Sequence, residues 1–431
     1  MSLEPTGYRP RLLDRMLERK LKAFGAIEVT GTKFCGKTWT SLAHGESIAH
    51  IDDAPIRRMA ELDASLVLEG ARPHVVDEWQ DVPGIWDAVR RRVDEEGNAR
   101  GQFILTGSST TDMRLVSHSG AGRIARLHMR PMSLLESGLS DGSVSLAGLF
   151  EGTFERHQVE ADVRQLARAI CQGGWPASLG MEQDLVGEVP SQYLDALFEV
   201  SATRRGLDPS LARRVAISLA RSTGHAPTYR TLYADACEGE EAAGVDPSVF
   251  RQAIEPYVAF FREQHFVEDL LGWDAPVKSR SRVRTKPRRS FVDPSLPAAL
   301  LGMTPSRLLL ETQLFGSLFE ELCLRDLRVY ASALGLTPEP QVRYYSDADG
   351  LEADAVIELP DGRWAAFEVK LSEEKVPEAE KGLLRLRNKV AANPAARNPE
   401  PAFLAVIVGK ASYAWRTPKG VYVVPVTTLG A

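Results

Sequence analysis

Residues 26–38 read AIEVTGTKFCGKT, an apolar stretch that runs directly into the pattern G-x-x-x-x-G-K-T. The apolar part predicts a buried strand and the residues after the pattern predict a helix, which is the setting of a phosphate-binding loop. The loop consists of Gly31, Thr32, Lys33, Phe34, Cys35, Gly36, Lys37 and Thr38. In such a loop backbone N–H groups point at the β-phosphate, the lysine reaches the β- and γ-oxygens, and the Thr38 hydroxyl ligates Mg²⁺. We therefore expect a site for ATP or GTP with Mg²⁺.

A second acidic element follows the loop. Residues 73–80 read PHVVDEWQ, which predicts a short strand that ends in two adjacent carboxylates. Asp77 would then hold Mg²⁺ through its water shell, and Glu78 would polarise the attacking water. A surface Asp-Glu turn after a buried strand is the alternative interpretation.

A third apolar stretch, GQFILTG at residues 101–107, ends in small polar residues that include Thr106 and Ser108. Open α/β sheets place their ligands at the carboxyl ends of parallel strands, so these hydroxyl groups are further candidates for the site. The three stretches occur in the order that a nucleotide hydrolase requires.

These parts, in this order, resemble the AAA-type ATPases, in which the third strand ends in a residue that senses the γ-phosphate. The resemblance makes Ser108 or Thr106 that residue. It also implies an arginine that a ring neighbour brings to the γ-phosphate, and Arg123 is the residue we expect in this role. Arg126 and Arg130 lie close enough in the sequence to compete for it, and an ordinary surface arginine is the alternative.

A narrower resemblance rests on the stretches VTGTKFCGKT, VVDEWQDVP, GQFILTGSS, GAGRIARLHMRPMSLLE and GGWPASL. Together they resemble a bacterial and archaeal group of AAA ATPases whose C-terminal domain is similar to restriction nucleases. Lys33 stands where an arginine is usual in that group, and Trp79 where an aliphatic residue is preferred. The resemblance covers nearly the whole chain and implies an α/β protein with three domains. These are an AAA-type P-loop core with a parallel sheet at residues 1–140, a helical lid and winged helix at 141–300, and a restriction-nuclease-like α/β domain at 301–431.

Composition limits the remaining possibilities. A chain of 431 residues with 44% hydrophobic and 26% charged residues predicts a globular protein of about two to three domains. No apolar run approaches the roughly 20 residues of a membrane helix, and the N-terminal segment lacks the apolar core of a signal peptide, so we expect a cytoplasmic protein without a membrane partner. The cysteines are far apart and the histidines lack ligand spacing, which indicates neither a disulfide framework nor a zinc site. With a net charge of −6, contacts to nucleic acid must come from local patches.

One basic patch is the segment VKSRSRVRTKPRRS at residues 277–290. Basic residues occupy every second position, namely Lys278, Arg280, Arg282, Arg284, Lys286 and Arg288. In an extended strand this period places them on one face at a repeat of ~6.6 Å, which suits the phosphates of a nucleic-acid backbone. A basic linker fits equally well, because Pro287 and the serines are also typical of loops. Both interpretations leave a cationic surface that we expect to bind DNA.

The region before this patch has the order of a winged helix. Helical periodicity recurs in three stretches, and Asp246 followed by Pro247 marks the start of a further helix. A strand-like stretch at residues 266–273 and the basic segment come next. Winged helices in ATPases serve DNA binding in some proteins and packing or protein contacts in others, and the helix from Val249 onward is not basic, so both roles stay open. The three helical stretches are residues 191–205, 209–222 and 228–237.

The last third of the chain contains a second group of chemically distinctive residues. Its expected elements follow an αβββαββ order, which resembles the restriction-nuclease-like fold and its D…E-x-K pattern. The resemblance makes Asp354 and Glu368 ligands of a divalent metal and adds Glu320 of the first helix to the metal shell. Lys370 would position the water or stabilise the phosphorane. Charged residues at strand ends can also be simple solubilising charges.

Two functions compete on this basis. In the first, a ring of identical subunits, expected to be a hexamer, couples ATP hydrolysis to moving, remodelling or cutting duplex or branched DNA. In the second, the ATPase is a nucleotide-gated switch and a degenerate nuclease-like domain binds a partner protein. We favour the first function, because Glu78, Arg123 and the acidic and basic residues of the C-terminal group are all present, whereas a switch could lose any of them.

Overall fold

The computed structural model describes residues 3–108, 120–160, 162–237, 246–276 and 286–431. The chain divides into two compact units, of which the first comprises Met1–Pro131 with Phe261–Phe266 and the second Met132–Phe260 with Val267–Ala431. Most of the middle region that we expected to be a separate domain therefore shares a compact unit with the C-terminal region. Among the described residues, no helix is both long and apolar enough to cross a membrane.

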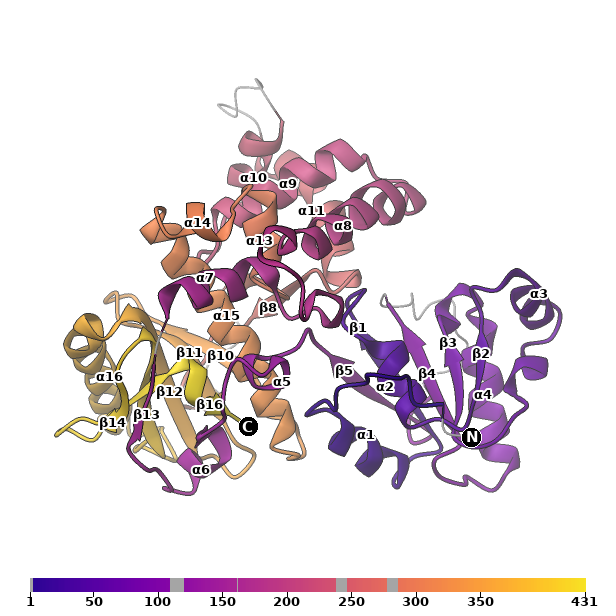
Figure 1. Ribbon diagram of the computed structural model, residues 1–431, viewed down its shortest axis with the longest axis horizontal. Coiled ribbons are helices and arrows are strands. Elements are labelled where there is room, and N and C mark those ends of the chain that lie inside the picture. The colour runs from indigo at the N-terminus through magenta and orange to yellow at the C-terminus, as the bar shows by residue number, and fades with distance from the viewer. Residues whose placement is uncertain (1–2, 109–119, 161, 238–245, 277–285) are drawn as a thin grey trace. The chain divides into compact units, whose positions relative to one another are not determined.

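A five-stranded parallel sheet forms the centre of the first unit, with the order β2-β3-β4-β1-β5 (Figure 1). All four neighbouring pairs are parallel, so each pair needs a crossover connection. The expected α/β class with an N-terminal parallel sheet is confirmed. The strands are β1 (Ala26–Gly31), β2 (Ser47–His50), β3 (His74–Asp77), β4 (Phe103–Gly107) and β5 (Ile124–Met129), and the helices are α1 (Asp14–Leu21), α2 (Lys37–Ala43), α3 (Ala54–Leu62) and α4 (Gly84–Glu95).

Both faces of this sheet are buried. Ile27 and Val29 of β1 pack in one cluster with Leu17 of α1, whereas Ala26 packs in another with Trp86 of α4. Successive side chains of a strand point to opposite faces, so a strand covered on both sides must be apolar at nearly every position. This arrangement explains why the strands are mostly apolar, although β1 also contains the buried Glu28, which pairs with Arg126.

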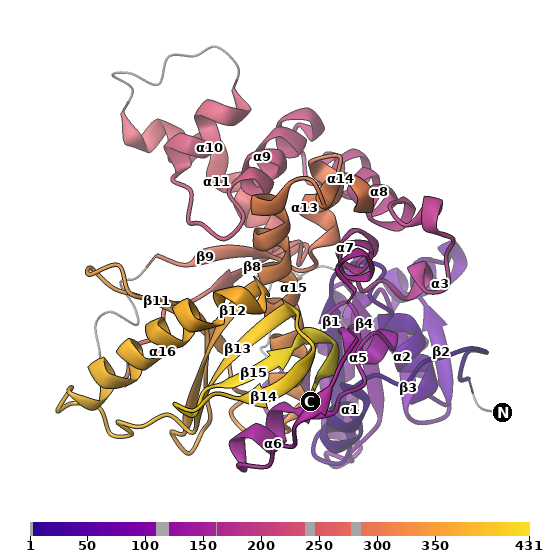
Figure 2. The same cartoon turned by 60° about the vertical axis from the view of Figure 1, so that its left-hand side comes forward.

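A seven-stranded mixed sheet forms the C-terminal part of the second unit, in the order β10-β11-β12-β13-β15-β14-β7 (Figure 2). The pairs from β10 to β12 are antiparallel, and the pairs from β12 through β13 to β15 are parallel. The elements from α15 to β15 follow the αβββαββ order expected from the sequence, with β14 as an additional strand between β13 and β15. The elements are α15 (Thr312–Ala333), β10 (Val342–Ser346), β11 (Glu352–Glu358), β12 (Trp364–Ser372), α16 (Val376–Ala391), β13 (Phe403–Lys410), β14 (Tyr413–Arg416), β15 (Tyr422–Pro425) and β7 (His157–Gln158).

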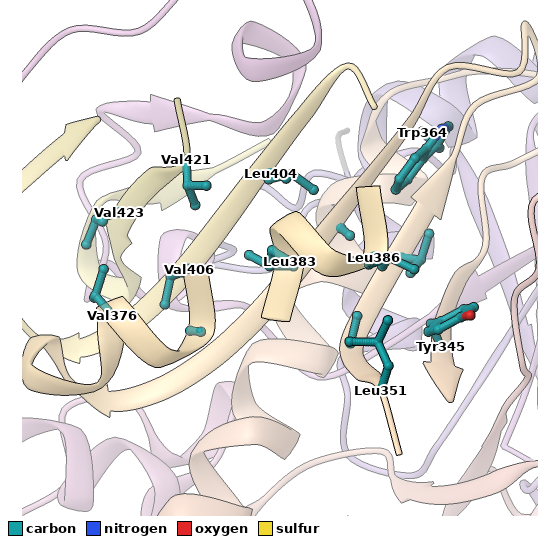
Figure 3. Close-up of a cluster of buried hydrophobic side chains, with 14 of the residues drawn as sticks. Tyr345, Leu351, Trp364, Val376, Leu383, Leu386, Leu404, Val406, Val421 and Val423 are labelled. Carbon is teal, nitrogen blue, oxygen red and sulfur yellow. The ribbon is translucent and has the colours of Figure 1, made fainter. Parts of the chain in front are cut away.

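Helix α16 is fixed to this sheet by a cluster of buried side chains (Figure 3). Leu383 and Leu386 of α16 belong to one cluster with Trp364 of β12 and with Leu404 and Val406 of β13. Complete burial of a leucine stabilises a fold by about 1.5–3 kcal/mol relative to exposure, so this face alone holds the helix in place. Helix α15 packs against β10, β11 and β12 of the same sheet.

The helices of the middle region lie before this sheet in the chain. Helices α9, α10 and α11 are followed by the antiparallel pair of β8 and β9, which is the winged-helix order expected from the sequence (Figure 2). Helix α11 begins at Pro247, as the N-cap pattern predicted. The remaining elements are α5 (Leu134–Ser137), β6 (Val144–Ser145), α6 (Leu146–Phe150), α7 (Val163–Gln172), α8 (Glu188–Asp195), α9 (Pro209–Arg221), α10 (Tyr229–Ala236), α11 (Pro247–Glu263), β8 (Val267–Leu270), β9 (Arg288–Phe291), α13 (Ser295–Leu300), α14 (Pro305–Leu308) and β16 (Leu429–Gly430).

A buried ionic cluster joins distant segments of the second unit. The guanidinium of Arg325 in α15 contacts Asp293 at 2.9 Å and Asp326 at 2.8 Å. The backbone N–H of Gly174 donates to Asp293 at 2.9 Å, and that of Leu134 donates to Asp326 at 3.1 Å. Removing one partner of a fully buried ion pair costs about 3–5 kcal/mol, because the remaining charge stays unpaired. The GGWP stretch is therefore part of the framework of the second unit.

We predict a pH-dependent contribution of Glu321 to stability. This residue of α15 accepts a hydrogen bond from Ser290 at 2.6 Å, and burial raises its pKa from 4.5 to about 7. Between these two pH values the folded protein keeps a proton that the unfolded chain releases, so stability should fall as pH rises through this window and level off above it. Each unit of pKa shift corresponds to about 1.4 kcal/mol.

Glu321→Gln carries no charge at any pH and should remove this dependence. The urea midpoint of the variant, compared with wild type, should therefore rise more at pH 8 than at pH 4.5. Glu378→Gln, on the exposed side of α16, is the matched control and should show no such difference. An equal effect of Glu321→Gln at both pH values would contradict the prediction.

Candidate active site

The phosphate-binding loop connects β1 to α2, and its backbone adopts conformations that few residues tolerate. Gly31 has a φ of 149° and Gly36 a φ of 103°, both in the region that favours glycine. A Cβ atom on Gly31 would lie 2.1 Å from the carbonyl oxygen of Met129. Phe34 also has a positive φ, of 64°. The glycine spacing in the sequence is therefore a requirement of the loop's backbone.

Lys37 is the first residue of α2, and its side chain turns back over the loop. Its Nζ donates a hydrogen bond to the carbonyl oxygen of Thr32 at 2.8 Å, and the residue is buried. A buried cation is costly unless an anion or several acceptors compensate it. The loop thus holds a positive charge in a position that a phosphate group would stabilise.

Thr38, expected to ligate Mg²⁺, and Asp77, expected to hold it through its water shell, are in hydrogen-bond contact. The Thr38 hydroxyl donates to both carboxylate oxygens of Asp77, at 3.1 and 3.2 Å, and Thr106 donates to the same carboxylate. Burial raises the pKa of Asp77, against the lowering effect of the bond from Thr106. A hydroxyl and a carboxylate are hard ligands, and Mg²⁺ usually takes few protein oxygens and fills its shell with water and phosphate. This donor set therefore fits a magnesium ion.

Glu78 lies beside Asp77, at the point where the chain leaves β3. Its backbone is left-handed, with φ of 55°, and its N–H donates to the Thr106 hydroxyl at 3.4 Å. Ser108 donates to Oε2 of Glu78 at 3.3 Å, and the side-chain amide of Gln80 donates to the same oxygen. Ser108, expected to sense the γ-phosphate, thus contacts the candidate catalytic carboxylate.

Arg11 is a residue of this site that sequence reasoning missed. Its guanidinium donates to the carbonyl oxygen of Cys35 in the loop at 2.9 Å and to that of Arg130 at 2.8 Å. The side chain is buried, so these bonds brace the loop against the end of β5. No motif or periodicity marked Arg11, because its role depends on two carbonyl groups that are distant in the sequence.

The three candidate finger arginines occupy different positions around the sheet. Arg123 lies at the amino end of β5, next to Ala26 and away from the loop, and pairs with Asp94 at 2.8 Å. Arg126 pairs with Glu28 at 2.7 Å in mid-strand. Arg130 follows the carboxyl end of β5, the end that pairs with Gly31. Arg123 therefore cannot act on the nucleotide of its own loop, and its role towards a neighbour stays a prediction.

The second unit brings Asp354 of β11, Glu368 and Lys370 of β12, and Glu320 of α15 into one electrostatic group. Lys370 Nζ lies 2.6 Å from Glu368 and 3.8 Å from Asp354, which also accepts the N–H of Val369 at 2.7 Å. Burial and the charge of Asp354 raise the pKa of Glu368 to about 7 and that of Glu320 well above its usual value. Burial alone would lower the pKa of Lys370, but Asp354 and Glu368 outweigh it and raise that pKa.

The three carboxylates of the predicted metal site, Glu320, Asp354 and Glu368, lie close enough to interact electrostatically, with Lys370 beside them. Within the described residues, no group of three or more His, Cys, Asp or Glu side chains is arranged to hold a metal ion. The ammonium group of Lys370 lies between two of the carboxylates and compensates their charge. The catalytic role of Lys370 and the metal role of the carboxylates remain untested predictions.

The basic segment is only partly within the described residues, and the four residues Lys278, Arg280, Arg282 and Arg284 lie outside them. Lys286 is exposed. Arg288, at the start of β9, pairs with Glu352 at 2.9 Å and lies over the ring of Tyr344 at 4.3 Å. Burial raises the pKa of Glu320, and the positive charge of Arg288 opposes this rise. The DNA-binding role of Arg288 stays a prediction, and in the structure the charge of this side chain is paired with Glu352.

Comparisons with known families cover most of the chain in three parts. Residues 24–137 match the model of an AAA domain. Residues 163–307 and 315–429 match two domains of unknown function, DUF8612 and DUF4143 respectively. The restriction-nuclease-like assignment of residues 301–431 is therefore not confirmed. No protein of curated function matches the sequence.

Several solved structures are similar to this chain at low identity. A Walker-type ATPase of Pyrococcus abyssi is 12% identical, with 69% of this chain and 99% of that chain covered and a TM-score of 0.41. The RuvB Holliday junction branch migration motor of Thermotoga maritima is 16% identical, with 62% and 93% covered and a TM-score of 0.28. A DNA replication initiation factor is 14% identical, with 59% and 90% covered and a TM-score of 0.22.

We predict that Arg11 supports both the stability of the loop and nucleotide binding. Arg11→Ala leaves the carbonyl oxygens of Cys35, in a buried bond, and of Arg130, in a partly buried one, without this donor, which should cost about 1–3 kcal/mol. The thermal midpoint should fall and ATP affinity, measured by titration calorimetry, should weaken. Arg11→Lys should be intermediate because an ammonium lacks the fork of a guanidinium. The exposed Arg15→Ala is the control, and equal behaviour of the two alanine variants would refute this role.

Proposed function

We propose that the protein, whose residues 24–137 match an AAA domain, binds and hydrolyses ATP with Mg²⁺. The observation that carries the proposal is the convergence of Lys37, Thr38, Asp77 and Glu78 at one edge of the sheet. A cation for the phosphates, oxygen ligands for the metal and a carboxylate for the water are the parts that phosphoryl transfer to water needs.

Each of these four residues has a different role in the proposed reaction. Lys37 binds and orients the β- and γ-phosphates, and Thr38 with Asp77 holds the metal ion. A magnesium ion held there would supply positive charge that stabilises the negative charge developing on the phosphate oxygens. Glu78 accepts the proton of the attacking water, because it is the second carboxylate at this edge and is not engaged by Thr38.

We propose further that the protein works as a homo-oligomer, most simply a hexameric ring. The support is the position of Arg123. It lies at the amino end of β5, whereas its own loop follows the carboxyl end of the neighbouring strand β1. An arginine in this place can reach a γ-phosphate only in a neighbouring subunit. Its ion pair with Asp94 would have to open or be shared at such an interface.

The proposed partner is DNA, duplex or branched, bound through the basic segment at residues 277–290 and the winged-helix order of α9, α10, α11, β8 and β9. The sequence of the segment supports an electrostatic contact with phosphates. The proposed work of the ATPase is to move or remodel that DNA, with the C-terminal sheet as a nuclease-like domain that holds or cuts it.

A second candidate function is a nucleotide-gated switch whose C-terminal domain binds a partner protein. The position of Lys370 between Glu368 and Asp354 favours this candidate. A carboxylate pair that is already compensated by a lysine has less need of a divalent ion. Stimulation of the ATPase by DNA distinguishes the two functions, because only the first requires it.

We predict different defects for Glu78→Gln and Lys37→Ala. Glu78→Gln should bind ATP normally and fail to release phosphate, because only proton transfer is lost. Lys37→Ala should weaken ATP binding, because the removed cation faces the phosphates. Titration calorimetry and a steady-state phosphate assay measure the two effects. Full hydrolysis by Glu78→Gln would overturn the assignment.

We also predict that forked or duplex DNA raises the wild-type ATPase rate. If several basic residues contact phosphates, log K should fall linearly with log salt, at a slope of about −0.9 per contact on duplex DNA. Reversing Arg280, Arg282 and Arg284 to Glu should weaken binding for all sequences alike and flatten that slope.

The control for this experiment changes the net charge equally at exposed positions of the first unit. Its three reversals to Glu are at Arg9, Arg58 and Arg91. Equal loss of DNA affinity in both triple variants would show that only total charge matters. No stimulation of the wild-type ATPase by any DNA would favour the switch.

A further inference from the structure

Two neighbouring side chains donate hydrogen bonds to the same carboxylate oxygen of Glu78, Oε2. The side-chain Nε2 of Gln80 donates to Oε2, and the Ser108 hydroxyl donates to the same atom at 3.3 Å. Within the described part of the chain, no hydrogen bond reaches Oε1. Two donors on one oxygen fix the plane of the carboxylate and leave the other oxygen available as an acceptor.

The backbone brings Gln80 to this position. The left-handed conformation of Glu78 turns the chain sharply at the end of β3, and the short helix η2 (Trp79–Asp81) begins at once. Trp79 is buried in the core beside Trp86, with ring centroids 5.1 Å apart. The indole thus anchors the turn, and the next residue, Gln80, points back at the carboxylate two positions earlier.

Gly107 provides the space that this side chain occupies. A Cβ on Gly107, at the end of β4, would lie 2.7 Å from Oε1 of Gln80 and 3.4 Å from Nε1 of Trp79. Any larger residue there would displace the amide from Glu78. The Gln80 side chain therefore packs closely between Glu78 and Gly107, the last residue of β4.

The orientation of the amide follows from the charge of its partner. An ionised carboxylate only accepts hydrogen bonds, so Gln80 must present Nε2 to Glu78 and turn Oε1 away. That Oε1 is buried and has no hydrogen-bond partner among the described residues. An unsatisfied buried acceptor costs about 1–3 kcal/mol and needs an explanation. The bond to Glu78 requires this orientation and explains the cost.

We propose that Gln80 is a positioning residue, which with Ser108 aims Oε1 of Glu78 at the attacking water. The inference rests on the proposed hydrolysis of ATP and deepens it. No step beyond proton transfer from water to Glu78 is added, and Gln80 does not itself take up or release a proton. A base held by a second group in hydrogen-bond contact follows the general logic of activated catalytic residues.

The test uses the full-length protein and separates kcat from ATP affinity. Gln80→Ala should lower kcat by about tenfold or more, as the loss of such an outer partner typically does, with ATP affinity unchanged. Gln80→Glu should lower kcat further, because a second carboxylate repels Glu78. Gln102→Ala is the matched control, since Gln102 is a buried glutamine at the far end of the same strand region, bonded to Ala99 at 2.8 Å. Its kcat should equal that of wild type.

A double-mutant cycle with Glu78→Gln completes the test. If Gln80 acts only through Glu78, then Gln80→Ala should cause no additional loss of the residual activity in the Glu78→Gln protein. An unchanged kcat in Gln80→Ala, or an additive loss in the double variant, would overturn the inference while ATP hydrolysis stands. Weaker ATP binding by Gln80→Ala would also overturn it, in favour of direct contact with the nucleotide. A wild-type protein without ATPase activity would instead sink the proposed function itself.

Discussion

The parallel pairing of β1 with β4, and of β4 with β3, is the constraint on which the candidate active site depends. It aligns Thr30 with Gly107 and Val76 with Leu105, so the three strands end at the same edge of the sheet. The loop, the two carboxylates and the hydroxyl groups follow directly after those ends. Without a shared edge, residues that are some 70 positions apart in the sequence (from Lys37 to Ser108) would not meet. Parallel sheets require crossovers, and these bury both faces and keep the edge fixed.

The two units stabilise their neighbouring carboxylates in different ways. In the first unit Asp77 and Glu78 are adjacent, and hydroxyl and amide donors from Thr38, Thr106, Ser108 and Gln80 stabilise them. Such donors leave room for a cation and a phosphate. In the second unit the ammonium of Lys370 compensates Asp354 and Glu368 directly. Uncharged hydrogen-bond donors leave the carboxylates free to bind and release a charged ligand. A lysine that already pairs with the carboxylates favours the ligand-free protein.

Ion pairs and hydrogen bonds link segments of the second unit that are distant in the sequence. Arg325 binds Asp293 and Asp326, and backbone groups from residues 134 and 174 complete the cluster. Arg288 of the β8–β9 hairpin pairs with Glu352 of the C-terminal sheet. The hairpin of the winged-helix order is thereby connected to the C-terminal carboxylates by an ion pair. A change at one of these places would alter the electrostatic balance at the other.

The sequence by itself determined the loop, the Asp77-Glu78 pair and the order of the elements. A phosphate-binding loop depends on local backbone geometry at Gly31 and Gly36, and apolar periodicity reports the burial of strands directly. The αβββαββ order of the C-terminal region was visible for the same reason, apart from the additional strand β14. These are short-range properties, and neighbouring residues fix them.

Only the tertiary structure decided which partners the side chains have. Arg11 braces the loop through carbonyl groups of residues 35 and 130, and no local pattern encodes that contact. Arg288 follows the period of the basic segment, yet the pairing of β9 turns it towards Glu352. The boundary expected near residue 300 separates no compact units, because buried ion pairs cross it. Long-range pairing depends on how the whole chain packs, and a single sequence records it only where a motif requires a fixed spacing.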